Sequence, residues 1–370
     1  MATLIPFTSS IRCLPPTPAF AATSKPLAVL SSERKMRVPY ELRKGQSRLF
    51  HELPSGLSME VIVQEGAKPG ERTGDPPLVF VHGSYHAAWC WAEHWLPFFS
   101  SRGFDCYALS LLGQGESDVP PGSVAGSLQT HAADVADFIS RNLALPPVLL
   151  GHSFGGLIVQ YYLANIKSGQ YSGQCSSSWA FMLFDVVLTE ESVEKCKAHS
   201  RNLLELSLFA LYLPLWPSLI SCFLYLSGLV WRYLFTKPIA AFKVTRSLAA
   251  KAFQTSVPLC KETFFSPMME DQLVQRYQLL MKESSHMPLF DLRKLNASLP
   301  VPSIPKSTVQ ILVMGANNDF IVDAKGLEET GNFYRVSPIC VEGVAHDLML
   351  DCSWEKGAEA ILSWLRMELV

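Results

Sequence analysis

The segment Val148-Leu149-Leu150-Gly151-His152-Ser153-Phe154-Gly155-Gly156-Leu157 decides the fold. Three apolar residues of β type precede a serine flanked by glycines, and a helix-like stretch follows as far as residue 165. This order predicts a strand, a tight turn with Ser153 at its tip, and a helix. Glycine suits such a turn because strand and helix can approach closely only where the neighbours of the serine lack a Cβ. We therefore interpret Ser153 as a nucleophile displayed at the end of a strand.

Further apolar runs on both sides of this segment have the same character. Each is short and bounded by turn residues, and most are followed by a helical pattern. This repeating order predicts an α/β fold with a mostly parallel sheet flanked by helices. The predicted strands are residues 57–63 at a sheet edge, 78–81, 105–109, 148–150, 179–187, 309–314 and 334–341, and a C-terminal helix is predicted over 354–369.

A long insertion interrupts this series between residues 189 and 305. It contains helical stretches but no clear alternation of strand and helix. We therefore predict a helical cap, or lid, placed over the sheet. The two parts of the α/β core are then residues 46–188 and 306–370, and residues 1–45 lie outside it.

The N-terminal segment has an unusual composition. Its first 32 residues contain no Asp or Glu, but five Ser, four Thr and five Pro. This is typical of a plastid transit peptide, because a mitochondrial presequence is richer in Arg and a secretory signal needs an unbroken apolar run. An ordinary disordered tail is the alternative. We predict that residues 1–45 are a transit peptide and disordered leader and that the protein resides in the chloroplast.

The net charge and the spacing of the cysteines argue against two classes of function, nucleic-acid binding and zinc binding. The formal net charge is −2, so no strong field attracts nucleic acid, and we expect no nucleic-acid partner. The nine cysteines include no C-x-x-C pair and no Cys/His spacing suited to zinc. We predict reduced core thiols, no metal and no cofactor.

A serine hydroxyl needs a histidine to take its proton and a carboxylate to orient that histidine. Three histidines, His199, His286 and His346, follow Ser153 in the chain. The first two fall in the predicted cap, whereas His346 lies just beyond the last predicted strand, where a loop can reach the serine. His346 is therefore the predicted base.

The position of the acid is less narrowly defined. Asp319 lies five residues after Met314, in the loop that ends a predicted strand, and it is the favoured acid. Asp323 shares that loop, and Asp185 follows the preceding strand, so the spacing excludes neither of them as the acid.

Acyl transfer also requires N–H donors for the developing oxyanion. The backbone N–H of Phe154, directly after the serine, is the first predicted donor. The second is expected from the loop after residues 78–81, where Gly83 permits a turn that aims the N–H of Ser84, or alternatively Tyr85, into the site. His82 is interpreted as a brace for this loop.

Together these motifs resemble the α/β-hydrolase superfamily from about Pro76 to Leu365, with the cap as the unmatched part. The stretch His82-Gly83-Ser84-Tyr85-His86-Ala87-Ala88-Trp89-Cys90-Trp91 is similar to plant methylesterases and hydroxynitrile lyases. The lyases of that group carry Lys directly after the histidine, where this chain has Asp347. Epoxide hydrolases of the fold carry Asp at the position of Ser153. The resemblance therefore implies ester or thioester cleavage through an acyl-enzyme.

The predicted cap contains a long apolar run. Residues 206–231 include no charged side chain and are long enough to cross a bilayer core, but Pro214 and Pro217 interrupt them. The run is a membrane span, an ordinary buried core, or an apolar lid that docks on a membrane. We predict an apolar ester substrate, such as a lipid or prenyl ester, and peripheral or integral association with a plastid membrane through the cap.

These observations define the expected function and its competitors. The first expectation is a carboxylic ester hydrolase, esterase- or lipase-like, with an apolar substrate. The resemblance to plant methylesterases favours a small-molecule methylesterase instead, and the resemblance to plastid members of the superfamily favours a chlorophyll or pheophytin dephytylase. A protein of a different class, which binds a lipid in a membrane without cleaving it, is a further alternative.

Overall fold

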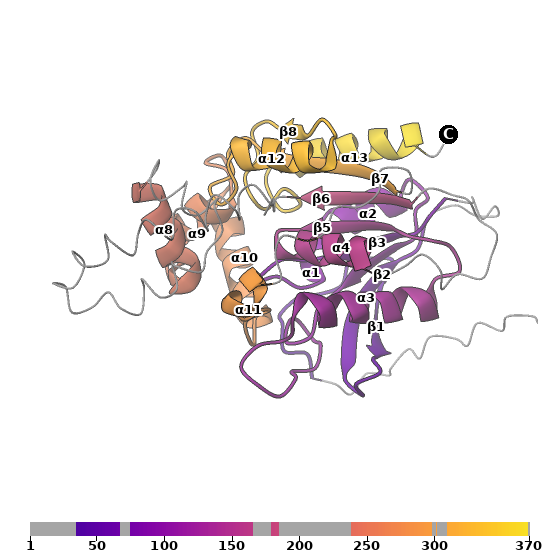
Figure 1. The fold of residues 1–370 in the computed structure, drawn as a ribbon. Coiled ribbons are helices and arrows are strands. Elements are labelled where there is room, and N and C mark those ends of the chain that lie inside the picture. The colour runs from indigo at the N-terminus through magenta and orange to yellow at the C-terminus, as the bar shows by residue number, and fades with distance from the viewer. Residues whose placement is uncertain are drawn as a thin grey trace, which may run out of the picture.

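The structure is a computed structural model, and it describes residues 35–66, 75–165, 179–184, 238–297, 301 and 309–368. These residues form an eight-stranded sheet in the order β1-β2-β4-β3-β5-β6-β7-β8 (Figure 1). Strand β2 is antiparallel to both of its neighbours, and all pairs from β4 to β8 are parallel. The strands are β1 Gln46–Glu52, β2 Ser58–Gln64, β3 Leu78–Val81, β4 Cys106–Leu109, β5 Val148–His152, β6 Trp179–Phe184, β7 Val309–Ala316 and β8 Ile339–Val341.

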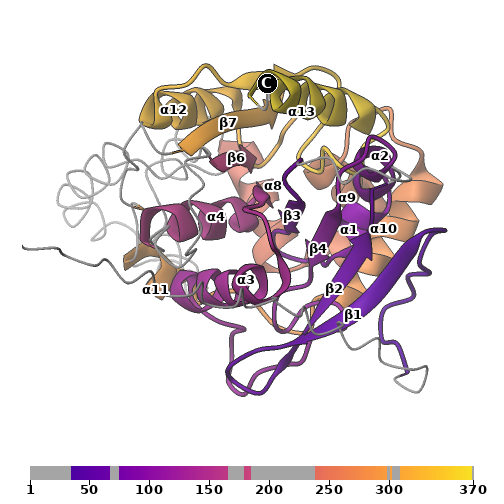
Figure 2. The same ribbon diagram turned by 90° about the vertical axis from the view of Figure 1, so that its right-hand side faces the viewer.

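The central strands are apolar throughout because helices cover both faces of the sheet. Phe80 in β3 points into one hydrophobic cluster with the helices α1, α2 and α13, and the neighbouring Val81 points into another with α3, α4 and α12. Figure 2 shows these helices on either side of the strands. They are α1 Trp89–Ala92, α2 Trp95–Ser100, α3 Leu128–Asn142, α4 Phe154–Asn165, α12 Ala324–Tyr334 and α13 Trp354–Glu368.

The described part of the predicted cap is helical. Its helices lie beyond the carboxyl ends of the strands (Figure 1). Two isolated bridges, Gln114 to Ser285 and Gly126 to Phe290, join it to loops of the core. The cap elements are α8 Pro238–Ala249, the 3-10 turn η3 Ala252–Gln254, α9 Val257–Phe264, α10 Asp271–Ser284 and α11 Leu292–Ala297.

The structure corrects the predicted N-terminal boundary of the fold. Strand β1 lies outside β2, so residues 57–63 are not an edge strand as predicted. Residues 35–45 were assigned to a disordered leader, yet Val38 and Tyr40 are buried in the core. The backbone N–H of Val38 donates to Oε1 of the buried Glu116 at 2.7 Å, which docks this segment. The strand predicted over 334–341 is also shorter, since Tyr334 ends α12 and only Ile339–Val341 pair.

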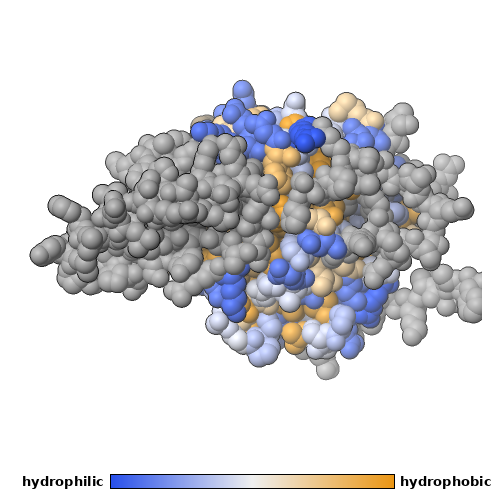
Figure 3. Space-filling model, in the orientation of Figure 1, coloured by the Kyte–Doolittle hydropathy of each residue, from blue (hydrophilic) through white to orange (hydrophobic). Residues whose placement is uncertain are grey.

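Surface character follows the same layering. Hydrophilic residues cover the outer face of α12 at the top of the view in Figure 3, while Leu327 on its inner face is buried. In the part of the chain that the structure describes, no helix has the length and apolar character of a membrane span. The apolar run over residues 206–231 and the predicted transit segment over residues 1–32 lie outside the described residues.

Candidate active site

Ser153 occupies the turn between β5 and α4, as the sequence predicted. Its φ angle is +52°, a left-handed conformation that is strained for a residue with a side chain. The N–H of Gly156 donates to the carbonyl oxygen of Ser153 at 2.8 Å and closes the turn. This conformation is the one that a serine displayed at a sharp strand-to-helix turn adopts.

The loop after β3 lies directly against this serine. A Cβ added to Gly83 would lie 2.7 Å from the Cβ of Ser153 and 3.3 Å from its Oγ. Real Cβ atoms do not approach so closely, so only glycine allows the two segments to touch. The loop that was predicted to carry the second oxyanion donor is therefore beside the serine hydroxyl.

His346 and Asp319 form a buried pair. The Nδ1 of His346 lies 2.8 Å from Oδ2 of Asp319, and the other carboxylate oxygen accepts from the backbone N–H groups of Ile321 at 2.6 Å and Val322 at 2.8 Å. Burial alone would lower the pKa of His346, but the charge and hydrogen bond of Asp319, with a contribution from Asp347, bring it above its usual value. The carboxylate is thus placed to orient the ring and stabilise its protonated form.

The serine turn and the loop of His346 are bonded to each other through His152. The Nε2 of His152 lies 3.0 Å from the carbonyl oxygen of His346, and the two rings are 4.8 Å apart at their centroids. Because His152 immediately precedes Ser153, this contact holds the backbone of the predicted base beside the predicted nucleophile.

The alternative acids and bases have other partners or lie outside the described residues. Asp323 is the N-cap of α12, where its Oδ1 accepts from the N–H of Gly326 at 3.1 Å. The Nε2 of His286 lies 3.0 Å from the carbonyl oxygen of Gly115 and links the cap to the core. Asp185 and His199 lie outside the described residues.

Two backbone segments supply donors near Ser153. Phe154 is the first residue of α4, so its N–H has no acceptor within the helix. In the opposite loop, Leu111 donates its N–H to Nε2 of His82 at 3.0 Å, which leaves the proton of this ring on Nδ1 to donate to the carbonyl oxygen of Gly83 at 2.7 Å.

The role of His82 follows from its burial and these two bonds. Burial lowers the pKa of His82 to about 3, so the ring is neutral. Because the peptide group is planar and trans, fixing the carbonyl of Gly83 also fixes the N–H of Ser84 in the opposite direction. His82 is therefore a brace for the loop, as the sequence predicted.

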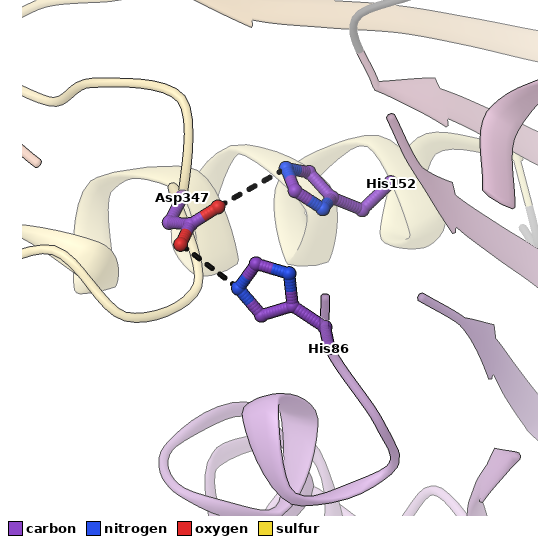
Figure 4. Close-up of side chains that lie close together, drawn as sticks. All are labelled: His86, His152 and Asp347. Carbon is purple, nitrogen blue, oxygen red and sulfur yellow. Dashed lines mark hydrogen bonds and ion pairs between the residues drawn. The ribbon is translucent and has the colours of Figure 1, made fainter. Parts of the chain in front are cut away.

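A second buried cluster beside this site was not found from the sequence. It consists of His86, His152 and Asp347, whose side chains meet as Figure 4 shows. The Nε2 of His86 lies 2.9 Å from Oδ2 of Asp347, and the ligand-type atoms of all three residues lie within 4.8 Å of one another. Among the described residues, these are the three that could together hold a metal ion. The sequence does show an acidic residue, Asp347, directly after the predicted base, but its partner His86 lies 261 positions away.

Comparisons with known proteins agree with this architecture. A sequence model of the Alpha/beta hydrolase family matches residues 78–360, which is more than half of the chain. The chain is also 27% identical over 154 residues to a candidate methylesterase of Arabidopsis thaliana, methylesterase 15, chloroplastic, a match that covers 42% of this chain and 34% of that protein. The matched part spans 20% to 34% of the length of the curated relatives.

Solved structures with different activities share the fold. An esterase from Exiguobacterium antarcticum superimposes with a TM-score of 0.53 at 17% identity, over 86% of this chain and 98% of the esterase. An epoxide hydrolase from Vigna radiata superimposes with a TM-score of 0.54 at 15% identity, over 88% of this chain and 99% of the hydrolase. At such low identity these similarities establish the fold, and the reaction has to be inferred from the residues of the site.

Proposed function

The chain belongs to the alpha/beta hydrolase family, and from that premise we propose that it is a serine hydrolase that cleaves a carboxylic ester through an acyl-enzyme. The observation that carries this proposal is the hydrogen bond of His346 to Asp319, in a loop that is bonded to the turn of Ser153. A base that is oriented by a carboxylate and held beside a strained serine is the arrangement that activates a hydroxyl nucleophile.

The proposed reaction assigns one step to each group. Ser153 attacks the ester carbonyl while His346 accepts its proton, and Asp319 stabilises the imidazolium. The backbone N–H groups of Ser84 and Phe154 stabilise the oxyanion. His346 then donates the proton to the leaving alcohol, and the same groups activate a water that releases the acid.

The serine itself favours ester over epoxide chemistry. Opening an epoxide through an alkyl-enzyme needs a carboxylate nucleophile. The intermediate is then an ester, which water can hydrolyse at its acyl carbon. A serine would form an ether from which this release is not available. Ser153 therefore supports acyl transfer, although epoxide hydrolases share the fold.

A fluorophosphonate probe tests the nucleophile directly. We expect the purified protein to be labelled, labelling to be lost in Ser153→Ala, and the label to map to the peptide that contains Ser153. Labelling in Asp323→Asn, a carboxylate of the same loop that caps α12, should match that of the wild type. Equal labelling of wild type and Ser153→Ala would contradict the proposal.

For the substrate we propose an apolar, long-chain ester in the chloroplast, at a membrane contacted through the cap. The apolar run over residues 206–231 and the acid-free first 32 residues support this. Hydrolysis of a series of p-nitrophenyl esters should become faster with acyl length and with added vesicles. A fluorescent fusion of residues 1–45 should be imported by isolated chloroplasts.

The second candidate function is a small-molecule methylesterase. It is favoured by the similarity to methylesterase 15 and by the stretch from His82 to Trp91. Faster cleavage of short soluble methyl esters than of long-chain esters would select it. Release of the alcohol from pheophytin would select a dephytylase, and ligand binding without turnover would select a binding protein.

A further inference from the structure

His86 lies in the loop after β3 and is almost completely buried. Its Nδ1 lies 2.8 Å from the carbonyl oxygen of Ser84, and its Nε2 lies 2.9 Å from Oδ2 of Asp347. Figure 4 shows the carboxylate of Asp347 facing the rings of both His86 and His152. The ring of His86 therefore links the loop proposed to bind the oxyanion to the loop that carries the proposed base.

The partners of His86 determine where its protons are. A carbonyl oxygen and a carboxylate both accept hydrogen bonds and have no proton to donate. Both ring nitrogens must then carry a proton, so His86 is an imidazolium as long as Asp347 is ionised. Burial opposes ionisation of Asp347, but the charge and hydrogen bond of His86, with His152 and His346 contributing, hold the pKa of this carboxyl below its usual value.

Burial keeps the third member of this cluster, His152, and two nearby thiols neutral. The Nε2–H of His152 donates to the carbonyl of His346 and lies 3.7 Å from Oδ1 of Asp347, and burial lowers the pKa of His152 to about 3. Burial and the charge of Asp347 raise the pKa of the Cys90 and Cys260 thiols. Within the cluster of His86, His152 and Asp347, the positive charge that compensates the carboxylate is therefore assigned to His86.

This charge pair joins three segments at the site. Ser84 is held at its carbonyl by His86, and the next residue, Tyr85, has a strained φ of +68°. Asp347 follows His346, and its N–H donates to the carbonyl of Phe264 in the cap at 2.9 Å. The peptide group on the other side of Ser84 is fixed by His82. Both peptides that flank Ser84 are therefore oriented by buried histidines.

We propose, on the basis of the function proposed above, that His86 is a positioning residue for ester cleavage. Its imidazolium ties the carbonyl of Ser84 to the carboxylate of Asp347 and so holds the oxyanion loop in register with the base. Charge-assisted hydrogen bonds at both ends make this link stronger than one between neutral groups.

Two substitutions break the link from either end. His86→Gln can keep a donor for Asp347 but lacks one in the direction of Ser84, and Asp347→Asn removes the charge that the imidazolium needs. Because the oxyanion is present only in the transition state, we expect each variant to lower kcat about 10- to 100-fold while KM changes less than about threefold. Since both substitutions break the same link, the kcat of the double variant should be no lower than that of the less active single variant.

A matched control separates this effect from the loss of a buried histidine. His131 is as buried as His86, but its Nε2 bonds to the carbonyl of Leu289, away from the serine turn. His131→Gln should lower stability without lowering kcat at a temperature where the protein is folded. A kcat near that of the wild type in His86→Gln, or losses that multiply in the double variant, would overturn the proposal.

A spectroscopic test does not depend on activity. In nitrogen-15 NMR, the two nitrogens assigned to His86 by comparison with His86→Gln should both be protonated. A neutral ring would overturn the proposal even if the ester hydrolase is confirmed. Stoichiometric divalent metal that is lost in His86→Gln would also overturn it, because a ligating nitrogen cannot carry a proton. Absence of fluorophosphonate labelling in the wild type would instead reject the proposed function.

Discussion

Oδ2 of Asp319 accepts a hydrogen bond from Nδ1 of His346, across 2.8 Å, between the loops that follow the neighbouring strands β7 and β8. Parallel strands bring these loops to one edge of the sheet, so an acid and a base that are 27 positions apart meet. The backbone N–H groups of Ile321 and Val322 hold the other carboxylate oxygen and fix the direction of the pair.

Asp319→Asn should abolish most of the activity. An amide in this place favours the wrong tautomer of His346 and cannot stabilise its charged form, so we expect kcat to fall about 10³- to 10⁴-fold. Steady-state kinetics with a chromogenic ester measures this loss. Asp323→Asn is the control from the same loop. Asn can still accept the hydrogen bond from the N–H of Gly326, so the change should remove only a favourable charge at the N-terminus of α12, cost at most about 1 kcal/mol of stability and leave kcat within about twofold. The reverse pattern would identify Asp323 as the acid.

The pH profile should move in a known direction in Asp347→Asn. His346 can act as a base only when it is neutral, so kcat/KM rises as the pH increases through its pKa. The negative charge of Asp347 contributes to the raised pKa of His346. Its removal lowers that pKa, and the acidic limb of the profile should shift to lower pH even though the maximum rate falls. An unchanged limb or a shift to higher pH would contradict this electrostatic role.

The sequence supported the prediction of the serine turn because all of its determinants are local. A buried strand, glycines beside Ser153 and a helix-like stretch are consecutive, and the order of the strands placed Asp319 and His346 at the same edge. Contacts between side chains that are far apart in the sequence could not be predicted in this way. The bond from His86 to Asp347 depends on how two distant loops pack, and the motif that contains His86 does not indicate its partner.

The first strand was missed for a related reason. Residues 46–52 carry polar or charged side chains at several positions, and only Leu49 and His51 are buried. An edge strand of this kind has one solvated face, so its sequence resembles that of a polar linker. The docking of Val38 also depends on Glu116, a residue in a loop 78 positions away.

Gly83→Ala should reduce activity far more than stability. The added methyl group would meet the Cβ of Ser153 at 2.7 Å, so the loop or the serine must shift. Displacing oxyanion donors costs about 10²- to 10³-fold in kcat, and we expect a loss of this order together with slower fluorophosphonate labelling. Gly56→Ala is the control, since Gly56 has a φ of +79° but no atom within 4 Å of an added Cβ. That change should cost roughly 1 kcal/mol of stability and leave kcat unaffected.

The attachment of the cap to the core should depend on pH through Glu93. This buried carboxylate, directly after α1, binds the guanidinium of Arg276 in cap helix α10 through contacts of 2.7 and 3.1 Å, and Arg43 also contacts it at 2.7 Å. Burial alone would raise the pKa of Glu93, but the hydrogen bond and charge of Arg276, with the charge of Arg43, hold it below its usual value.

Arg276→Leu tests this attachment. A carboxyl with a lowered pKa stabilises the folded protein at pH values above its unfolded pKa, and this contribution disappears as the pH falls through the folded pKa. Because the Arg276 side chain is partly exposed and Arg43 remains, we expect a cost of about 1–2 kcal/mol at neutral pH. Urea unfolding at neutral pH and near pH 3.5 measures the cost at each pH. A difference between variant and wild type that does not shrink at the lower pH would show that the loss comes from packing of α10 and not from the charge of Glu93.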